Sequence, residues 1–119
     1  MNNNAVITTD EHCTIYLSGD HRDFIVFRSG MARTIELFDI QVGSSRREGK
    51  GKQLVQAMLD ILKEKESDVS MVYAIVRLSN AIAHQFYEAL DFRLVGRLHY
   101  FYRDGGGKNE HALVYGLDV

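Results

Sequence analysis

The chain has 119 residues, about the size of one domain, and with 45% apolar and 25% charged residues it has the composition of an ordinary globular protein. Its formal charge of -2 disfavours a general nucleic-acid-binding protein, and its single cysteine, Cys13, excludes an internal disulfide or a zinc site built from several thiolates. No segment approaches the ~18 consecutive apolar residues of a membrane helix, and the first residues do not resemble a signal peptide. We therefore expect one soluble, cytoplasmic domain over residues 1–119, with a buried Cys13 and no nucleic-acid or membrane partner.

The first half of the chain is predicted to consist of strands followed by one helix. Residues 12–18 (HCTIYLS) and 23–29 (DFIVFRS) are rich in β-branched and aromatic residues and are separated by a polar turn, which predicts a hairpin. Residues 33–42 (RTIELFDIQV) are dense enough in large apolar side chains to predict a central strand. In residues 52–66 (KQLVQAMLDILKEKE) apolar residues recur at helical spacing, which predicts an amphipathic helix.

The second half alternates in the same way. Residues 71–77 (MVYAIVR) form a short apolar run that predicts a strand, and residues 79–92 (SNAIAHQFYEALDF) predict a helix that Ser79 or Asn80 can cap. Residues 93–119 predict two strands around a glycine-rich turn, with a bulge near Gly96. The order of elements predicts an α/β domain in which helices pack on a mixed sheet.

A basic, glycine-containing run lies where the first helix is predicted to begin. Residues 45–53 (SRREGKGKQ) include four basic residues and two glycines. The first N–H groups of a helix have no partner within the helix, its dipole favours anions, and glycine allows close approach, so the run predicts a site for an anion such as phosphate. A solvated turn is the alternative, because short runs of this kind are common. The pattern GxxxxGK[ST] is absent and Leu54 takes the third glycine position of GxGxxG, so ATP and dinucleotides are disfavoured.

Two motifs of this chain together resemble one superfamily. The stretch RREGKG resembles the [Q/R]-x-x-G-x-[G/A] pyrophosphate loop of the GNAT superfamily of acetyl-CoA-dependent N-acyltransferases, with Arg46, Gly49 and Gly51 at the defining positions. Downstream, SNAIAHQFYEALDF resembles the superfamily's second motif, N-x-x-A-x-x-[FL]-Y-x-x-x-G-F. The matching residues are Asn80, Ala83, Phe86, Tyr87 and Phe92. The resemblance covers about residues 33–117 and implies a GNAT-like, mixed and mostly antiparallel central sheet flanked by helices.

The resemblance also implies a mode of binding for acetyl-CoA. In such proteins the strand before the loop parts from the strand after the first helix, and the pantetheine arm lies in the gap. The backbone of Ile40 and Val42 would pair with pantetheine, while Arg46 and Lys50 would add positive charge near the pyrophosphate. The backbone amides expected to hold the pyrophosphate are those of Arg47, Glu48, Gly49, Lys50, Gly51 and Lys52. Asn80 would hydrogen-bond the cofactor from the other side, or serve only as a helix cap.

The implied reaction is attack of an amine on the thioester carbonyl, followed by departure of a thiolate. It needs a base for the amine proton, a donor to the oxyanion and an acid for the leaving thiolate. Tyr87 matches the family position of the acid, although its ring could simply fill the space beside Phe86. Glu36 is the candidate base because some relatives carry a catalytic glutamate at about this place; a structural ion pair or an exposed charge is the alternative reading.

The side chain of Glu36 can be placed only if its strand is regular. In that case Glu36 shares a face with Phe38, Ile40 and Val42, and Asp39, a weaker candidate for the base, points to the opposite face. The loop before Arg46 is one residue shorter than in many relatives, which could shift this register by one.

Three features depart from the family pattern. Relatives usually have two helices between the first strands, forming part of the acceptor pocket, whereas only polar turns separate the strands of this chain before residue 33. Asp91 replaces the usual glycine before Phe92, which is tolerable because aspartate can adopt a left-handed conformation. Ile75 and Val76 stand where N-terminal acetyltransferases carry a glutamate, so acetylation of peptide N-termini is less favoured.

The sequence thus predicts an N-acetyltransferase that transfers an acetyl group from acetyl-CoA to a primary amine of a small molecule or peptide. No metal is expected, because the five histidines lack the close spacing to acidic residues that metal sites need. A non-catalytic acyl-CoA-binding or interaction module with the same fold is the alternative, and a homodimer that completes the acceptor pocket is a third reading. The aromatic residues 99–103 (HYFYR) could line that pocket or pack in the core or a dimer interface.

Overall fold

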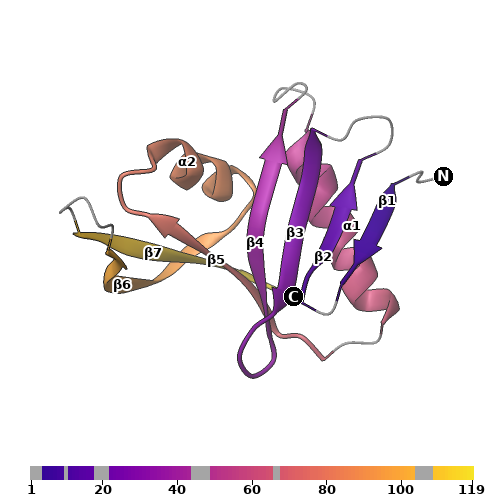
Figure 1. Ribbon diagram of the computed structural model, residues 1–119. Coiled ribbons are helices and arrows are strands. Elements are labelled where there is room, and N and C mark those ends of the chain that lie inside the picture. Colours follow the sequence, from indigo (N-terminus) through magenta and orange to yellow (C-terminus); the bar gives the residue numbers. More distant parts are fainter. Residues whose placement is uncertain (1–3, 10, 18–21, 44–48, 66–67, 104–108) are drawn as a thin grey trace.

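A computed structural model describes residues 4–9, 11–17, 22–43, 49–65, 68–103 and 109–119. Within these ranges the chain forms seven strands and two helices (Figure 1). In chain order they are β1 (Ala5–Thr8), β2 (Cys13–Tyr16), β3 (Asp23–Ser29), β4 (Thr34–Val42), α1 (Lys50–Glu64), β5 (Met71–Arg77), α2 (Ala81–Ala89), β6 (Arg93–Arg103) and β7 (Asn109–Asp118).

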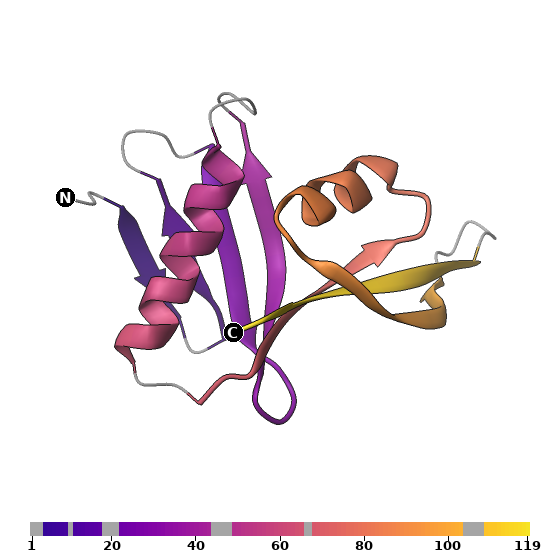
Figure 2. The same cartoon turned by 180° about the vertical axis from the view of Figure 1, so that it is seen from behind.

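All seven strands belong to one sheet with the order β1-β2-β3-β4-β5-β7-β6. Only β4 and β5 are parallel, and every other neighbouring pair is antiparallel. Helix α1 covers one face of the half formed by β1 to β4, and α2 lies beside the half formed by β5, β7 and β6 (Figures 1 and 2). The predicted α/β class, with a mixed and mostly antiparallel sheet, is confirmed. Both described helices follow β4, so the described residues before α1 form strands and turns but no helix.

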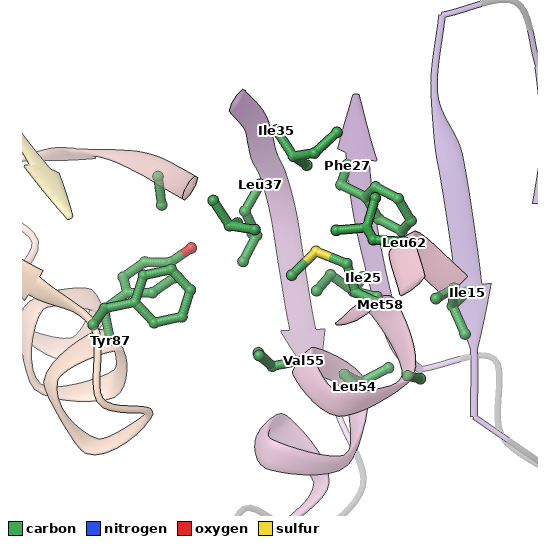
Figure 3. Close-up of a cluster of buried hydrophobic side chains, with 14 of the residues drawn as sticks. Ile15, Ile25, Phe27, Ile35, Leu37, Leu54, Val55, Met58, Leu62 and Tyr87 are labelled. Carbon is green, nitrogen blue, oxygen red and sulfur yellow. The ribbon is translucent and has the colours of Figure 1, made fainter. Parts of the chain in front are cut away.

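The main core lies between α1 and the strands β2, β3 and β4 (Figure 3). Leu54, Met58 and Leu62 recur every fourth residue of α1 and are buried, because this spacing keeps one face of the helix against the sheet. Alternate residues of β2 and β3 are buried, as expected of strands with one face on the core. The strand residues that line this core include Ile15, Ile25, Phe27, Ile35 and Leu37.

Most predicted elements are confirmed, with small shifts of their ends. The strands predicted at 23–29 and 71–77 coincide with β3 and β5, and the bulge expected near Gly96 appears as a register shift between Leu94 and Gly96. Asp91 adopts the expected left-handed conformation, with a φ of 68°. Strand β1 was not predicted: all four of its residues are exposed, so it has no buried face to give an apolar pattern.

Strand β4 is irregular at Phe38. The flanking residues pair with consecutive residues of β3, as Val26–Asp39 and Phe27–Leu37, so that Phe38 is an extra residue, a β-bulge. Directly opposed residues of antiparallel strands share a face of the sheet. Leu37 and Ile40 therefore both face α1, opposite buried residues of β3, although they are three positions apart.

The bulge overturns the arrangement expected for a regular strand. Ile40 and Val42 lie on the opposite face from Glu36 and pack against the core. Asp39 lies on the same face as Glu36, because the extra residue inverts the alternation from that point onward. The two carboxylates of β4 thus share one face.

Candidate active site

The candidate site is a cleft where β4 and β5 part. The two strands pair only from Thr34 to Glu36 on β4 and from Met71 to Tyr73 on β5. Beyond these pairs β4 stays with β3 and β5 stays with β7, and the two half-sheets diverge (Figure 1). An open cleft of about 690 Å³ occupies this region. The structure therefore has the parted strands that the family resemblance implies.

The cleft takes its walls from four elements. Residues 38–43 line it from β4 and just beyond its end, residues 75–77 from β5, residues 80, 82, 83, 86 and 87 from α2 and its N-cap, and Tyr102 from β6. Since β4 has no partner on its β5 side after Glu36, backbone N–H and C=O groups of this edge are open to the cleft. Unpaired backbone groups need a partner when water is excluded. An extended ligand with amide groups would supply one along this edge.

Helix α1 begins beside the cleft with free backbone donors. Its N-cap, Gly49, has a φ of 69°, a left-handed conformation that glycine adopts without strain, and a Cβ there would meet no atom within 4 Å. The first helical bond runs from the N–H of Gln53 to the carbonyl of Gly49 at 3.0 Å, so the N–H groups of Lys50, Gly51 and Lys52 have no partner within the helix. These three amides belong to the predicted pyrophosphate site. Three further predicted residues, Arg46, Arg47 and Glu48, lie outside the described residues.

Gly51 joins the two motifs. A Cβ on this buried residue would lie 2.9 Å from Cζ and 3.0 Å from Cε1 of Phe86, which is closer than carbon atoms normally approach. Phe86 also lines the cleft. The missing side chain at Gly51 therefore lets the start of α1 approach α2 and places the free amides of α1 next to the cleft.

Tyr87 is a buried aromatic residue whose hydroxyl reaches the cleft. Its ring lies between Phe86, Phe92 and Tyr115, with ring centroids 5.6, 5.2 and 5.9 Å away, and its hydroxyl points towards β4 (Figure 3). Burial raises the pKa of Tyr87 above its usual range, and the negative charge of Asp39 raises it further. The phenol is therefore protonated at neutral pH, which is the state an acid must have before it donates.

Asn80 caps α2 and lines the cleft. Its Oδ1 accepts a hydrogen bond from the N–H of Ala83 at 3.1 Å, which is the helix-cap reading of this residue. The cap uses only the oxygen of the amide, so the nitrogen could still donate a hydrogen bond to a cofactor. That hydrogen bond stays a prediction.

The two carboxylates of β4 have different surroundings. Nε of Arg28 lies 2.9 Å from Oε1 of Glu36, so the ion pair considered as an alternative for Glu36 is present. Glu36 is not among the residues that line the cleft, whereas Asp39 is. Among the residues that the structure describes, none forms an ion pair or hydrogen bond with the side chain of Asp39.

A cluster from three strands borders the opposite wall. The guanidinium of Arg77 lies 4.0 Å from the ring centroid of Tyr102 and 3.3 Å from the carboxylate of Glu110. Hydrogen bonds from Ser79 and then the nearby Arg77 lower the pKa of Glu110. Residues 99–101 are exposed, so the prediction that they pack in the core is wrong. Tyr102 is half-buried and lines the cleft. Sequence reasoning missed this cluster because its members come from separate strands; the signal available was the position of Tyr102 in the aromatic run.

Neither helix in the described part of the chain is long and apolar enough to cross a membrane. Among the same residues there is no group of three or more His, Cys, Asp or Glu side chains that could hold a metal ion.

Solved structures resemble the chain in fold. The Escherichia coli ribosomal-protein-S18-alanine N-acetyltransferase is 24% identical with a TM-score of 0.67, over 94% of this chain and 72% of that chain. A nourseothricin acetyltransferase is 25% identical with a TM-score of 0.73, over 92% and 66%. A Bacillus anthracis protein in complex with acetyl coenzyme A, assigned as a streptothricin acetyltransferase, is 23% identical with a TM-score of 0.78, over 95% and 65%. This chain thus spans about two thirds to three quarters of each.

Sequence comparison gives the family. No curated protein sequence matches the chain. The family model of the acetyltransferase (GNAT) family matches residues 11–92, which is more than half of the chain and includes both motifs. The chain therefore belongs to the GNAT acetyltransferase family.

Proposed function

We propose that this protein transfers an acetyl group from acetyl-CoA to the primary amine of a small molecule or peptide. The observation that carries the proposal is the cleft between β4 and β5, which has an unpaired strand edge on one side and the free amides of a helix N-terminus at its end. In acetyl-CoA, an extended arm with amide groups is followed by a diphosphate. The amides match the unpaired strand edge, and the diphosphate matches the helix N-terminus at its end.

The binding of acetyl-CoA would use mainly backbone groups. The backbone of Ile40 and Val42, on the open edge of β4, would pair with the amides of pantetheine. The pyrophosphate would accept hydrogen bonds from the N-terminal amides of α1, where the helix dipole also favours negative charge. Lys50 and Lys52 would add charge there, together with Arg46 and Arg47, and Asn80 would contact the cofactor from α2. The acetyl coenzyme A bound to the Bacillus anthracis structure supports this assignment.

Tyr87 would protonate the leaving thiolate. Its hydroxyl lines the cleft, and its raised pKa keeps the phenol protonated at neutral pH, so that the proton is available for the sulfur as negative charge develops there. A backbone N–H of β4 that has no partner in β5 would stabilise the oxyanion of the tetrahedral intermediate. The amine proton would go to a carboxylate on β4, either that of Glu36 or that of Asp39.

The acceptor class stays broad. Among the solved structures of the same fold, one acts on an alanine of a ribosomal protein and another on nourseothricin, so both peptide and small-molecule amines suit this architecture. The described residues before β4 form strands and turns, with no helix among them. This favours a second candidate, a module that binds acyl-CoA without turnover, or a homodimer in which a second copy completes the acceptor wall.

Two measurements test the proposal. Calorimetry with acetyl-CoA and CoA measures binding, and release of the CoA thiol in the presence of a panel of primary amines measures turnover. We expect binding in both cases and thiol release above the rate without amine. Binding with no release for any amine would support the non-catalytic module, and no binding at millimolar concentrations would contradict both candidates.

A matched variant separates the role of the Tyr87 hydroxyl from the packing of the Tyr87 ring. Tyr87→Phe keeps the ring between its aromatic neighbours and removes only the hydroxyl. We expect kcat to fall by about 10²–10⁴-fold, the usual contribution of a general acid, with unchanged affinity for acetyl-CoA. A kcat within threefold of the wild-type value would refute the assignment of Tyr87.

A further inference from the structure

The bulge at Phe38 decides which carboxylate meets the cleft. In a regular strand Asp39 would lie on the face that packs against α1, where a carboxylate would be buried among apolar side chains. The extra residue instead places Asp39 opposite Val26, on the face away from α1, and still lets Ile40 pack in the core. Bulges commonly occur next to active sites, where they redirect a side chain in this way.

Glu36 is poorly placed to accept a proton from a substrate in the cleft. Its Oε1 accepts from Nε of Arg28 at 2.9 Å, its side chain is 15% exposed, and it is not among the cleft-lining residues. Its backbone also lies in the last residue pair before β4 and β5 part, at the closed end of the gap. To act as a base, Glu36 would have to reach past the bulged residue with the carboxylate oxygen that does not bind Arg28.

Asp39 has the opposite properties. It is exposed, it lines the cleft, and in the part of the chain that the structure describes its carboxylate has no ion pair or hydrogen bond. It also lies close enough to Tyr87 for its charge to contribute to the raised pKa of that phenol. The open edge of β4, the expected position of the thioester, runs directly past it.

We propose that Asp39, rather than Glu36, is the base that accepts the proton of the attacking amine. This rests on the proposed acetyl transfer. The amine nitrogen forms a bond to the thioester carbonyl carbon, and the carboxylate of Asp39 takes the proton from the resulting ammonium. The C–S bond then breaks, the sulfur keeps the electron pair, and the thiolate takes the proton of Tyr87.

A proton transfer between Asp39 and Tyr87 then restores the starting protonation state of both residues. The protonated carboxyl of Asp39 gives its proton to the phenolate of Tyr87, so one proton passes from nitrogen to sulfur and both residues return to their starting states. The net reaction converts an amine and acetyl-CoA into an amide and CoA thiol, without another reactant. This relay accounts for the placement of Asp39 on the side of the cleft that Tyr87 faces.

The experiment compares Asp39→Asn with Glu36→Gln. Both substitutions keep the size of the side chain and remove its ability to accept a proton, and both enzymes are assayed for thiol release with acetyl-CoA and an amine that the wild-type protein acetylates. We expect Asp39→Asn to lower kcat by about 10²–10⁴-fold with acetyl-CoA affinity within threefold of wild type, and Glu36→Gln to lower it by less than about tenfold. Asp39→Glu should recover part of the loss.

A second readout distinguishes proton transfer from a structural role. With a weakly basic amine the adduct gives up its proton more readily, so the loss caused by Asp39→Asn should shrink, whereas a structural defect would be the same for every amine. Thermal unfolding of the variant should match that of wild type, because the side chain of Asp39 is exposed.

Three results would overturn the assignment. A large loss in Glu36→Gln with little loss in Asp39→Asn would make Glu36 the base. Small losses in both variants would mean that the proton goes directly to water. A wild-type protein that binds acetyl-CoA and releases no thiol with any amine would instead refute the proposed function itself, and this result is distinguishable because it appears before any substitution is made.

Discussion

The packing of Gly51 against Phe86 gives a prediction with a magnitude. In Gly51→Ala the new Cβ would lie 2.9 and 3.0 Å from two ring carbons of Phe86, whereas carbon atoms in contact are ~3.5–4.0 Å apart. The ring or the helix must therefore move by about 0.5–1 Å. Overpacking of this kind costs about 1–3 kcal/mol, and replacing a helical glycine by alanine returns at most about 1 kcal/mol. We expect the free energy of unfolding to fall by about 1–2 kcal/mol.

A double-mutant cycle measured by urea denaturation tests the cause. Phe86→Leu removes the ring edge, so Gly51→Ala should cost about 1 kcal/mol less in that background than in wild type. Gly49→Ala is the matched control: it has no atom within 4 Å of its Cβ but a φ of 69°, so it should cost about 1–2 kcal/mol by backbone strain and show no coupling to Phe86→Leu. Equal costs of Gly51→Ala in both backgrounds would refute the reasoning.

Three further predictions concern other parts of the molecule. His84→Ala removes one partner of the Tyr115 hydroxyl, which lies 3.0 Å from Nδ1, and should lower the free energy of unfolding by about 0.5–1.5 kcal/mol in the same assay; no change would mean that water or the nearby Glu88 takes the place of the ring. Because hydrogen bonds from Ser79 lower the pKa of Glu110 in the folded state, its contribution to stability is present above the unfolded pKa of 4.5 and is lost as pH falls through the lower, folded value. The stability difference between wild type and Glu110→Gln should therefore shrink on acidification, and a constant difference would contradict this. Addition of acetyl-CoA should slow hydrogen exchange of the β4 amides between 37 and 42, and unchanged exchange in the bound protein would place the ligand elsewhere.

Local patterns in the sequence predicted most elements because each has a buried face. The alternation in 23–29 and the apolar run at 71–77 gave β3 and β5 with correct ends, and the helical spacing of apolar residues gave α1. Strand β1 could not be predicted from the sequence, because its residues are exposed and it forms only by pairing with β2. A strand at the edge of a sheet, with no side buried, leaves no apolar period to find.

The site could be predicted only in part, for a different reason. Gly51 and Tyr87 belong to recognisable motifs, and both reach the cleft region. The bulge has no comparable signal, since it reflects a competition between burying Ile40 against α1 and keeping Asp39 out of the core. A rule of strict alternation cannot represent that competition, and it therefore assigned Asp39 to the wrong face.

The cleft itself follows from the way pairing is divided between the two half-sheets. Strand β5 pairs with β7 over its whole length, Met71 to Arg77, and β4 pairs with β3 from Ile35 to Val42, while β4 and β5 share only three residue pairs. Each half also carries its own helix (Figure 2), so each strand follows its longer pairing when sheet twist separates the halves. The cost is an edge of unpaired backbone groups along β4, which an interior strand would not normally keep. A ligand that hydrogen-bonds to this edge and also contacts α2 would offset that cost and connect the two halves. The division of the sheet therefore creates the backbone groups to which the ligand would bind.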